Sequence, residues 1–84
     1  MLTDYIQAAM GRAVYELLAG DEGYYGEIPG LQGVLGTAAT LEACRTDLQS
    51  ALEDWILFRL RRGHAVPVLG GIDLNTSLAA EEAA

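Results

Sequence analysis

The stretch YYGEIPGLQGVLGTAATLEA, residues 24–43, decides the fold of this chain. It places a strand-forming run before Pro29-Gly30, another over 34–39, and Thr40 where a helix would begin. Proline and glycine end strands and form turns, whereas a threonine before an apolar and acidic run is typical of a helix N-terminus. The stretch therefore predicts two strands joined by a short connection and followed by a helix.

A third strand is predicted on the N-terminal side of this stretch. The run AVYELL at 13–18 is rich in strand-forming residues, and GDEG at 20–23 supplies turn chemistry before the run at 24–28. These two runs predict a hairpin, and the run at 34–39 can return along it. The expected sheet is an antiparallel three-stranded meander.

The longest predicted helix begins at the Thr40 cap and ends near Gly63, a residue type common just past helix ends. Its apolar residues recur every three or four positions, which predicts one stripe that covers a face of the sheet. The stripe consists of Leu41, Cys44, Leu48, Ala51, Leu52 and Trp55. Leu57 and Leu60 fall on the otherwise polar side, so the end of this helix is expected to need a second partner surface.

Shorter elements are expected on both flanks. Thr3 is a candidate cap for a short N-terminal helix that ends before Gly11. The run HAVPVL at 64–69 predicts a short fourth strand at a sheet edge, where Pro67 is tolerated. Residues 1–74 are therefore expected to form a single domain. The small, acidic stretch 75–84 is expected to be a disordered tail.

Charge and composition restrict the class of partner. The 84 residues include twelve carboxylates and five arginines, with no lysine, and give a net charge of -7. Such a chain repels phosphate backbones, so direct nucleic acid binding is not expected and a basic protein is favoured as the partner. Because 51% of the residues are hydrophobic in so short a chain, we also expect burial between subunits, in a dimer or tetramer.

Location follows from the absence of targeting signals and disulfides. Cys44 is the only cysteine, so no intrachain disulfide can form and an oxidising compartment gains no support. The N-terminus lacks a signal-peptide pattern, and no apolar run approaches the roughly 20 residues that cross a bilayer. We therefore expect a soluble cytoplasmic protein with no membrane partner.

Catalytic chemistry finds little support in the residue pattern. The glycines fit neither a phosphate loop, which requires a lysine, nor the GxGxxG spacing of a dinucleotide site. His64 has no nearby nucleophile or second histidine, and Cys44 lies in the predicted apolar stripe. We therefore predict no enzyme activity, no catalytic residue, no metal site and no cofactor. The competing enzyme hypothesis is a metal-dependent nuclease that uses Glu16 and Glu27.

The order of motifs over residues 23–67 resembles the N-terminal domain of HicB-like antitoxins, which belong to type II toxin-antitoxin systems. The resemblance rests on the motif IPGLQG at 28–33, the helix start TLEA at 40–43, and a helix that ends in glycine shortly before Val66-Pro67. It implies an α+β fold similar to a partial ribonuclease H fold. It also implies a protein that binds and occludes a HicA-like toxin, a small basic RNA-cleaving protein.

The chain also departs from the family pattern. Positions 36–39 are GTAA where the family often has a polar turn, and an extra helix is predicted before the first strand. Many family members continue into a DNA-binding domain, whereas this chain ends about ten residues after Leu74, so operator binding is not expected. An orphan oligomeric scaffold of the same fold, without a toxin, remains an alternative.

Two sets of contact residues follow from the antitoxin hypothesis. The predicted toxin-binding residues lie on the second strand and in the turn before it, and they are Tyr24, Tyr25, Glu27, Asp21 and Glu22. Self-association is expected through the apolar end of the long helix or an exposed sheet edge. The helix residues predicted for it are Trp55, Leu57, Phe58 and Leu60.

Overall fold

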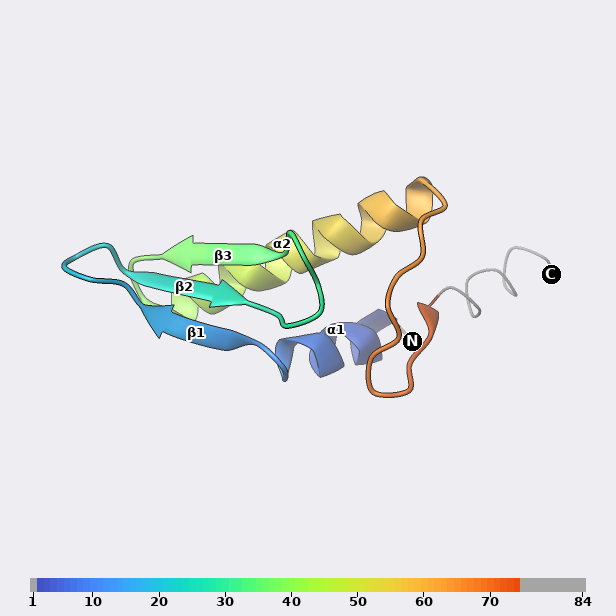
Figure 1. Ribbon diagram of the computed structural model, residues 1–84, viewed down its shortest axis with the longest axis horizontal. Coiled ribbons are helices and arrows are strands. Elements are labelled where there is room, and N and C mark those ends of the chain that lie inside the picture. Colours follow the sequence, from blue (N-terminus) through green and yellow to red (C-terminus); the bar gives the residue numbers. More distant parts are fainter. Residues whose placement is uncertain (1, 75–84) are drawn as a thin grey trace.

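The computed structural model describes residues 2–74 and has an α+β fold, in which one antiparallel sheet packs against a long helix (Figure 1). The elements, in chain order, are α1 (Leu2–Met10), β1 (Val14–Leu17), β2 (Tyr24–Glu27), β3 (Leu35–Ala38) and α2 (Leu41–Arg61). The expected meander and long helix are confirmed. Each strand is shorter than its predicted run, because the run ends belong to the connections.

The sheet has the strand order β1-β2-β3, and both strand pairs are antiparallel. The register aligns Tyr15 with Gly26, and Gly26 with Gly36, in one row across the three strands. The neighbouring row contains Tyr25, which pairs with Glu16 on β1 and with Thr37 on β3. Side chains alternate between faces along a strand, so these two rows point to opposite faces of the sheet.

The row that contains two glycines faces α2. A Cβ atom added to Gly36 would lie 2.7 Å from the backbone nitrogen of Leu48, and one added to Gly26 would lie 3.4 Å from Cys44 Sγ. Cys44 is fully buried, and its thiol donates to the Gly36 carbonyl at 3.5 Å. Gly36 thus allows the helix backbone to lie directly on the sheet, whereas Gly26 leaves room for the Tyr15 ring, since a Cβ there would lie 2.9 Å from Tyr15 Cδ1. Close approach of this kind is one reason for glycine within a strand.

Both ends of α2 have the predicted capping residues. The Thr40 hydroxyl accepts a hydrogen bond from the Ala43 N–H at 3.1 Å. At the other end Gly63 has a φ of 70°, while its N–H donates to the Leu60 carbonyl and the His64 N–H donates to the Arg59 carbonyl. This pair of bonds is a Schellman motif, which requires a left-handed residue and so favours glycine.

The buried stripe of α2 differs in part from the predicted one. Its fully buried members recur every four residues, and they are Cys44, Leu48, Leu52 and Ile56. Ile56 was missing from the predicted stripe, whereas Leu41 is 47% exposed although it was expected to be buried. Leu41 is the first residue of the helix, three residues before Cys44, whose thiol bonds to Gly36 on the sheet. Trp55 is half-buried and packs at the margin of the core.

The predicted fourth strand over 64–69 is wrong. Within the described residues, this segment adds no strand to the sheet, and Leu69 makes only an isolated bridge to Ile72. Instead the segment passes beside α1 and closes the core, where Val66 and Leu69 are buried (Figure 1). The Tyr5 hydroxyl donates to the Pro67 carbonyl at 2.6 Å. Proline has no N–H to give a strand ladder, and here its carbonyl is used by α1.

The first helix begins one residue earlier than the cap position predicted for it. Thr3 lies inside α1 instead of capping it, since the helix starts at Leu2. Tyr5, Ala9 and Met10 are the residues that α1 buries in the core. Neither described helix is long and apolar enough to span a bilayer. The predicted tail at 75–84 lies outside the described residues.

Candidate interaction surface

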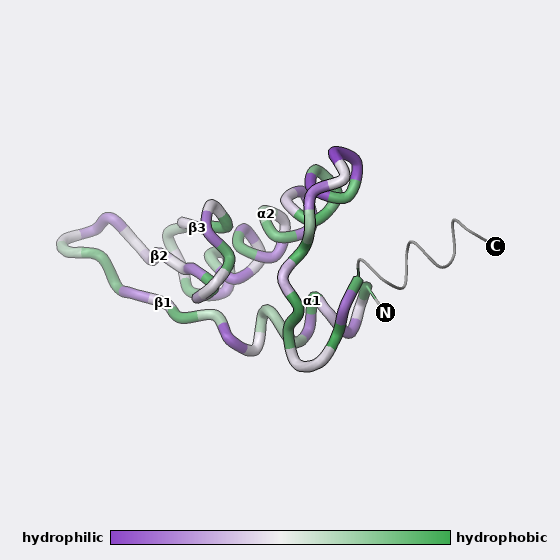
Figure 2. The backbone as a smooth tube through the Cα atoms, turned by 45° about the vertical axis from the view of Figure 1, so that its right-hand side comes forward, coloured by the Kyte–Doolittle hydropathy of each residue, from purple (hydrophilic) through white to green (hydrophobic). Residues whose placement is uncertain are grey.

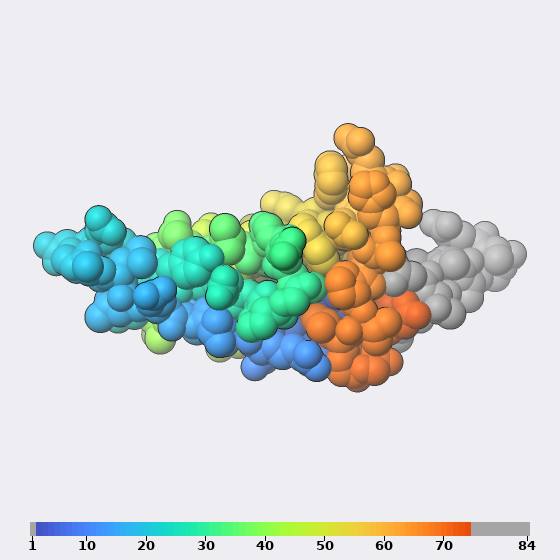
Figure 3. Space-filling view, in the orientation of Figure 1, coloured from blue at the N-terminus to red at the C-terminus, as the bar shows by residue number. Residues whose placement is uncertain are grey.

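The face of the sheet that points away from α2 is uncovered in the described chain. Figure 3 shows the strands on this side with no other segment lying over them. We call this surface the outer face, and the strand register assigns to it Val14, Glu16, Tyr25, Glu27, Leu35 and Thr37. Val14 and Leu35 are 49% and 47% exposed. The outer face therefore combines exposed aliphatic groups with two carboxylates and a tyrosine.

The electrostatic centre of the outer face is Tyr25. Its hydroxyl donates to Glu27 Oε2 at 3.2 Å, and Glu16 is its cross-strand partner on β1. Partial desolvation raises the pKa of Tyr25, and the carboxylates of Glu27 and Glu16 raise it further. Both carboxylates therefore act on the same hydroxyl group. No arginine lies on the three strands, so the field at this position favours a cation from another molecule.

The structure brings together only part of the predicted toxin-binding set. Tyr25 and Glu27 lie on the outer face, but Tyr24 is in the neighbouring row and points to the α2 side. Asp21 and Glu22 are exposed in the turn between β1 and β2, beyond the end of the strands. Successive side chains of a strand point to opposite faces, so Tyr24 and Tyr25 do not lie on the same surface.

Residues of the neighbouring strands complete the outer face, and the sequence interpretation did not include them. Val14 and Leu35 flank Glu27 on either side in the register. The alternation of β1 alone could not assign a face to Val14, because the run AVYELL is apolar at both parities. The sequence interpretation named Glu16 only for the nuclease hypothesis, and assigning it to the contact surface requires its pairing with Tyr25, hence the register of the hairpin.

The two carboxylates of the nuclease hypothesis share this face. Glu16 and Glu27 both lie beside Tyr25, which explains why the sequence pattern was compatible with a cation site. Among residues 2–74, no cluster of three or more histidine, cysteine or acidic side chains is placed to hold a metal ion.

The four residues predicted for self-association do not form one patch. Trp55 and Leu60 are half-buried and pack against the core, whereas Leu57 and Phe58 are 49% and 53% exposed. Leu57 and Leu60 line an apolar groove of about 210 Å³ between α2 and α1, with Leu2 on its other side. Phe58 lies elsewhere and carries the Arg62 guanidinium over its ring, at 5.0 Å from the centroid.

Comparison with known proteins places the chain in a family. The profile of the UPF0150-like family matches residues 4–67, which include both helices' core positions and all three strands. This chain belongs to the UPF0150-like family. The family is small and related to HicB-like antitoxins. The matched range ends at residue 67, as does the region 23–67 that the sequence motifs singled out, but it also includes most of α1 and the whole of β1.

A solved structure of similar sequence supports the fold of this UPF0150-like protein. It is the crystal structure of TTHA0281 from Thermus thermophilus, which is 53% identical, with a TM-score of 0.81. The alignment covers 87% of the present chain and 96% of the Thermus protein. No curated protein shows a significant match to the chain. The relationship thus extends over nearly the whole length of the Thermus protein.

Proposed function

We propose that this UPF0150-like protein is a non-enzymatic antitoxin of the HicB type, which binds and occludes a small basic HicA-like toxin. The observation that carries the proposal is the outer face, where Glu16 and Glu27 flank Tyr25 on an uncovered sheet. An enzyme that cleaves RNA needs a basic surface for the phosphate backbone, and carboxylates with an aromatic anchor complement such a surface. Occlusion requires binding alone, with no reaction by the antitoxin.

The overall charge supports the same partner. The net charge of -7 attracts a basic protein over a distance, and complementary potentials speed encounter and disfavour wrong partners. Val14 and Leu35 would then supply apolar area next to the carboxylates. Salt should weaken the complex mainly through slower association, because the long-range part of the attraction is screened.

The proposal is tested by co-expression with a HicA-like toxin encoded beside this chain. We expect the wild-type protein to restore growth, to co-purify with the toxin and to block RNA cleavage in vitro. The double variant Glu16→Gln/Glu27→Gln should lose at least about tenfold in affinity, since two cation partners are removed. Asp54→Asn, which changes the charge of an exposed residue on α2, is the matched control and should bind like the wild type.

Three results would contradict the proposal. Equal loss of affinity in the Asp54→Asn control would show that total charge matters and that the outer face does not. Titration with Mg²⁺ or Mn²⁺ addresses the nuclease alternative, because a carboxylate-dependent rise in melting temperature together with RNA turnover would identify an enzyme. Failure to bind any HicA-like toxin would leave the orphan scaffold.

A further inference from the structure

The first strand presents an open backbone edge. The Leu18 N–H donates to the Gly23 carbonyl at 2.8 Å, and hydrogen-bonded pairs alternate along an antiparallel ladder. Glu16 therefore bonds to Tyr25 on β2, while the N–H and C=O groups of Tyr15 and Leu17 point away from the sheet. We call these outward groups the β1 edge. No described strand pairs with this edge.

The side chains of β1 are exposed to an unusual degree for so apolar a strand. All four are exposed, and Leu17 reaches 67%, the largest value among the large hydrophobic residues of the described chain. Figure 2 shows hydrophobic residues on both sides of a hydrophilic one along β1. Of the features that usually protect a free edge, β1 has a short length of four residues and one charge, Glu16, but no lysine, proline or bulge. Its three apolar side chains are therefore left exposed beside an open backbone edge.

At the opposite edge of the sheet, on β3, one of the outward backbone N–H groups is already bonded. On β3 the residues with outward backbone groups are Leu35 and Thr37, by the same alternation. The Thr37 N–H is occupied, because it donates to Asp47 Oδ2 at 2.9 Å. A strand that approached β3 would have to displace this carboxylate. Strand addition is therefore favoured at β1.

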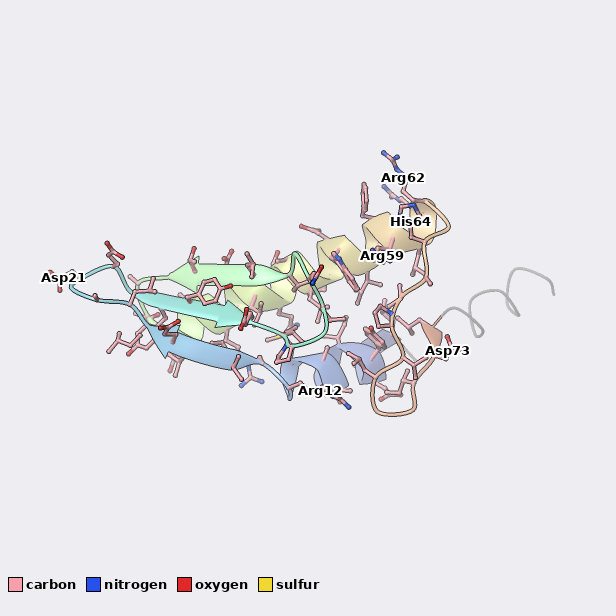
Figure 4. All side chains as sticks on the ribbon, viewed as in Figure 1. Arg12, Asp21, Arg59, Arg62, His64 and Asp73 are labelled. Carbon is pink, nitrogen blue, oxygen red and sulfur yellow. The ribbon has the colours of Figure 1, made fainter. Side chains whose placement is uncertain are left out.

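The charges at the two ends of β1 are opposite. Arg12 lies at the end next to α1, whereas Asp21 lies at the tip of the turn that follows β1 (Figure 4). Glu22 is beside Asp21, and all three side chains are exposed. Within one chain, the length of β1 separates Arg12 from the acidic turn. A second copy that runs antiparallel along β1 would place its acidic turn next to Arg12, and its Arg12 next to the acidic turn.

We propose that the β1 edge pairs antiparallel with the β1 edge of a second copy, which joins two sheets into one of six strands. The pairing is self-complementary in its backbone groups, its exposed apolar side chains and its end charges, as a two-fold interface requires. It makes the two outer faces continuous. The inference goes beyond the antitoxin proposal and does not depend on it, since it concerns the protein alone.

The first experiment measures mass and backbone protection together. Light scattering from micromolar to millimolar protein should show a dimer at the higher concentrations. Amide exchange followed by NMR should show the N–H groups of Tyr15 and Leu17 protected only in the dimer, whereas that of Glu16 is protected at every concentration. A monomer throughout this range, or a dimer in which the Tyr15 and Leu17 amides exchange freely, would overturn the proposal.

Substitutions at Leu17 distinguish the contribution of its backbone N–H to dimerisation from that of its side chain. Leu17→Pro removes an N–H that points away from β2, so the hairpin keeps its own bonds while the dimer loses one donor from each copy. We expect dissociation to the monomer with an unchanged far-UV spectrum. Leu17→Val keeps the N–H and strand propensity and should remain a dimer. If Leu57→Glu abolishes the dimer and Leu17→Pro does not, the interface is at the helix groove and the proposal fails.

Charge reversal tests the antiparallel direction. Arg12→Glu should weaken dimerisation about tenfold at low salt, because two symmetric attractions become repulsions. Adding Asp21→Arg and Glu22→Arg to Arg12→Glu should restore most of the lost affinity. Asp54→Arg added to Arg12→Glu is the matched control and should restore none. Equal recovery in both combinations would show a net-charge effect and reject the proposed direction. The assay contains no toxin, so its outcome is separate from that of the antitoxin test.

Discussion

The backbone N–H of Thr37 donates to Asp47 Oδ2 at 2.9 Å, and this bond attaches the edge of β3 that faces away from β2 to α2. The contact joins residues ten positions apart through a helix side chain. A strand that paired with β3 would have to displace this carboxylate, whereas no side chain of residues 2–74 bonds to the outward N–H groups of β1. Within the described residues, β1 is therefore the edge more available for pairing.

Replacing Asp47 with alanine should open the β3 edge. We expect the Thr37 amide to exchange much faster and the free energy of unfolding to fall by about 0.5–1.5 kcal/mol, the usual contribution of one such hydrogen bond. Asp54→Ala removes a carboxylate from an exposed site on the same helix and controls for charge and helix propensity. Unchanged Thr37 exchange in Asp47→Ala would show that the bond contributes nothing to protecting this edge.

Gly36→Ala should destabilise the contact between sheet and helix. The added Cβ would lie 2.7 Å from the Leu48 nitrogen and 2.9 Å from the Cys44 carbonyl oxygen, both of them backbone atoms. The helix must move away, at a cost of about 1–3 kcal/mol for overpacking. Urea denaturation measures the shift in midpoint. Gly11→Ala, whose Cβ would lie no nearer than 3.4 Å to the Gln7 carbonyl oxygen, should change stability by much less.

The elements that the sequence predicted well are those with local causes. Thr40 and Gly63 mark the boundaries of α2 because a cap acts through atoms within a few residues of it. The turn at Pro29-Gly30 likewise follows from the backbone preferences of the two residues themselves. For such features the pattern of residue types contains nearly all of the necessary information.

The features that were missed depend on contacts between distant segments. Alternation along β2 puts Tyr24 and Tyr25 on opposite faces, but which of the two faces α2 covers depends on the contact between Gly36 and the helix, which neighbouring residues do not determine. The segment 64–69 failed to form a strand because the core between α1 and α2 takes up Val66 and Leu69. Propensity for a strand was present, and tertiary packing outweighed it.

Thr40→Ala should remove the N-terminal cap of α2. The hydroxyl accepts the Ala43 N–H at 3.1 Å, and without it this donor has only solvent as a partner. The expected loss is about 1 kcal/mol in the free energy of unfolding. Thr40→Asp keeps an acceptor and adds a favourable charge at the helix N-terminus, so thermal unfolding should show it close to the wild type. Equal losses in both variants would show that Thr40 acts by some other means than capping.

Tyr5 links α1 to the segment that closes the core, and its hydroxyl is also a titrating group. The ring is fully buried and its hydroxyl donates to the Pro67 carbonyl at 2.6 Å. Burial raises the pKa of Tyr5 above its ordinary value of 10.0, and the positive charge of Arg59 offsets a smaller part of this rise. The folded state therefore holds the phenol proton more tightly than the unfolded chain does.

Tyr5→Phe should destabilise the protein at pH 7 by about 1–2 kcal/mol, because the part-buried hydrogen bond to the Pro67 carbonyl is lost. The raised pKa favours folding below pH 10, and this contribution is lost as the pH rises from 10 through the folded-state pKa, since the unfolded chain releases its proton first. The phenylalanine variant has no phenol to titrate, so its stability does not fall with pH for this reason. Urea denaturation at pH 7 and pH 11 should therefore show a smaller gap between wild type and variant at pH 11. An unchanged or wider gap would mean that Tyr5 does not contribute to alkaline unfolding.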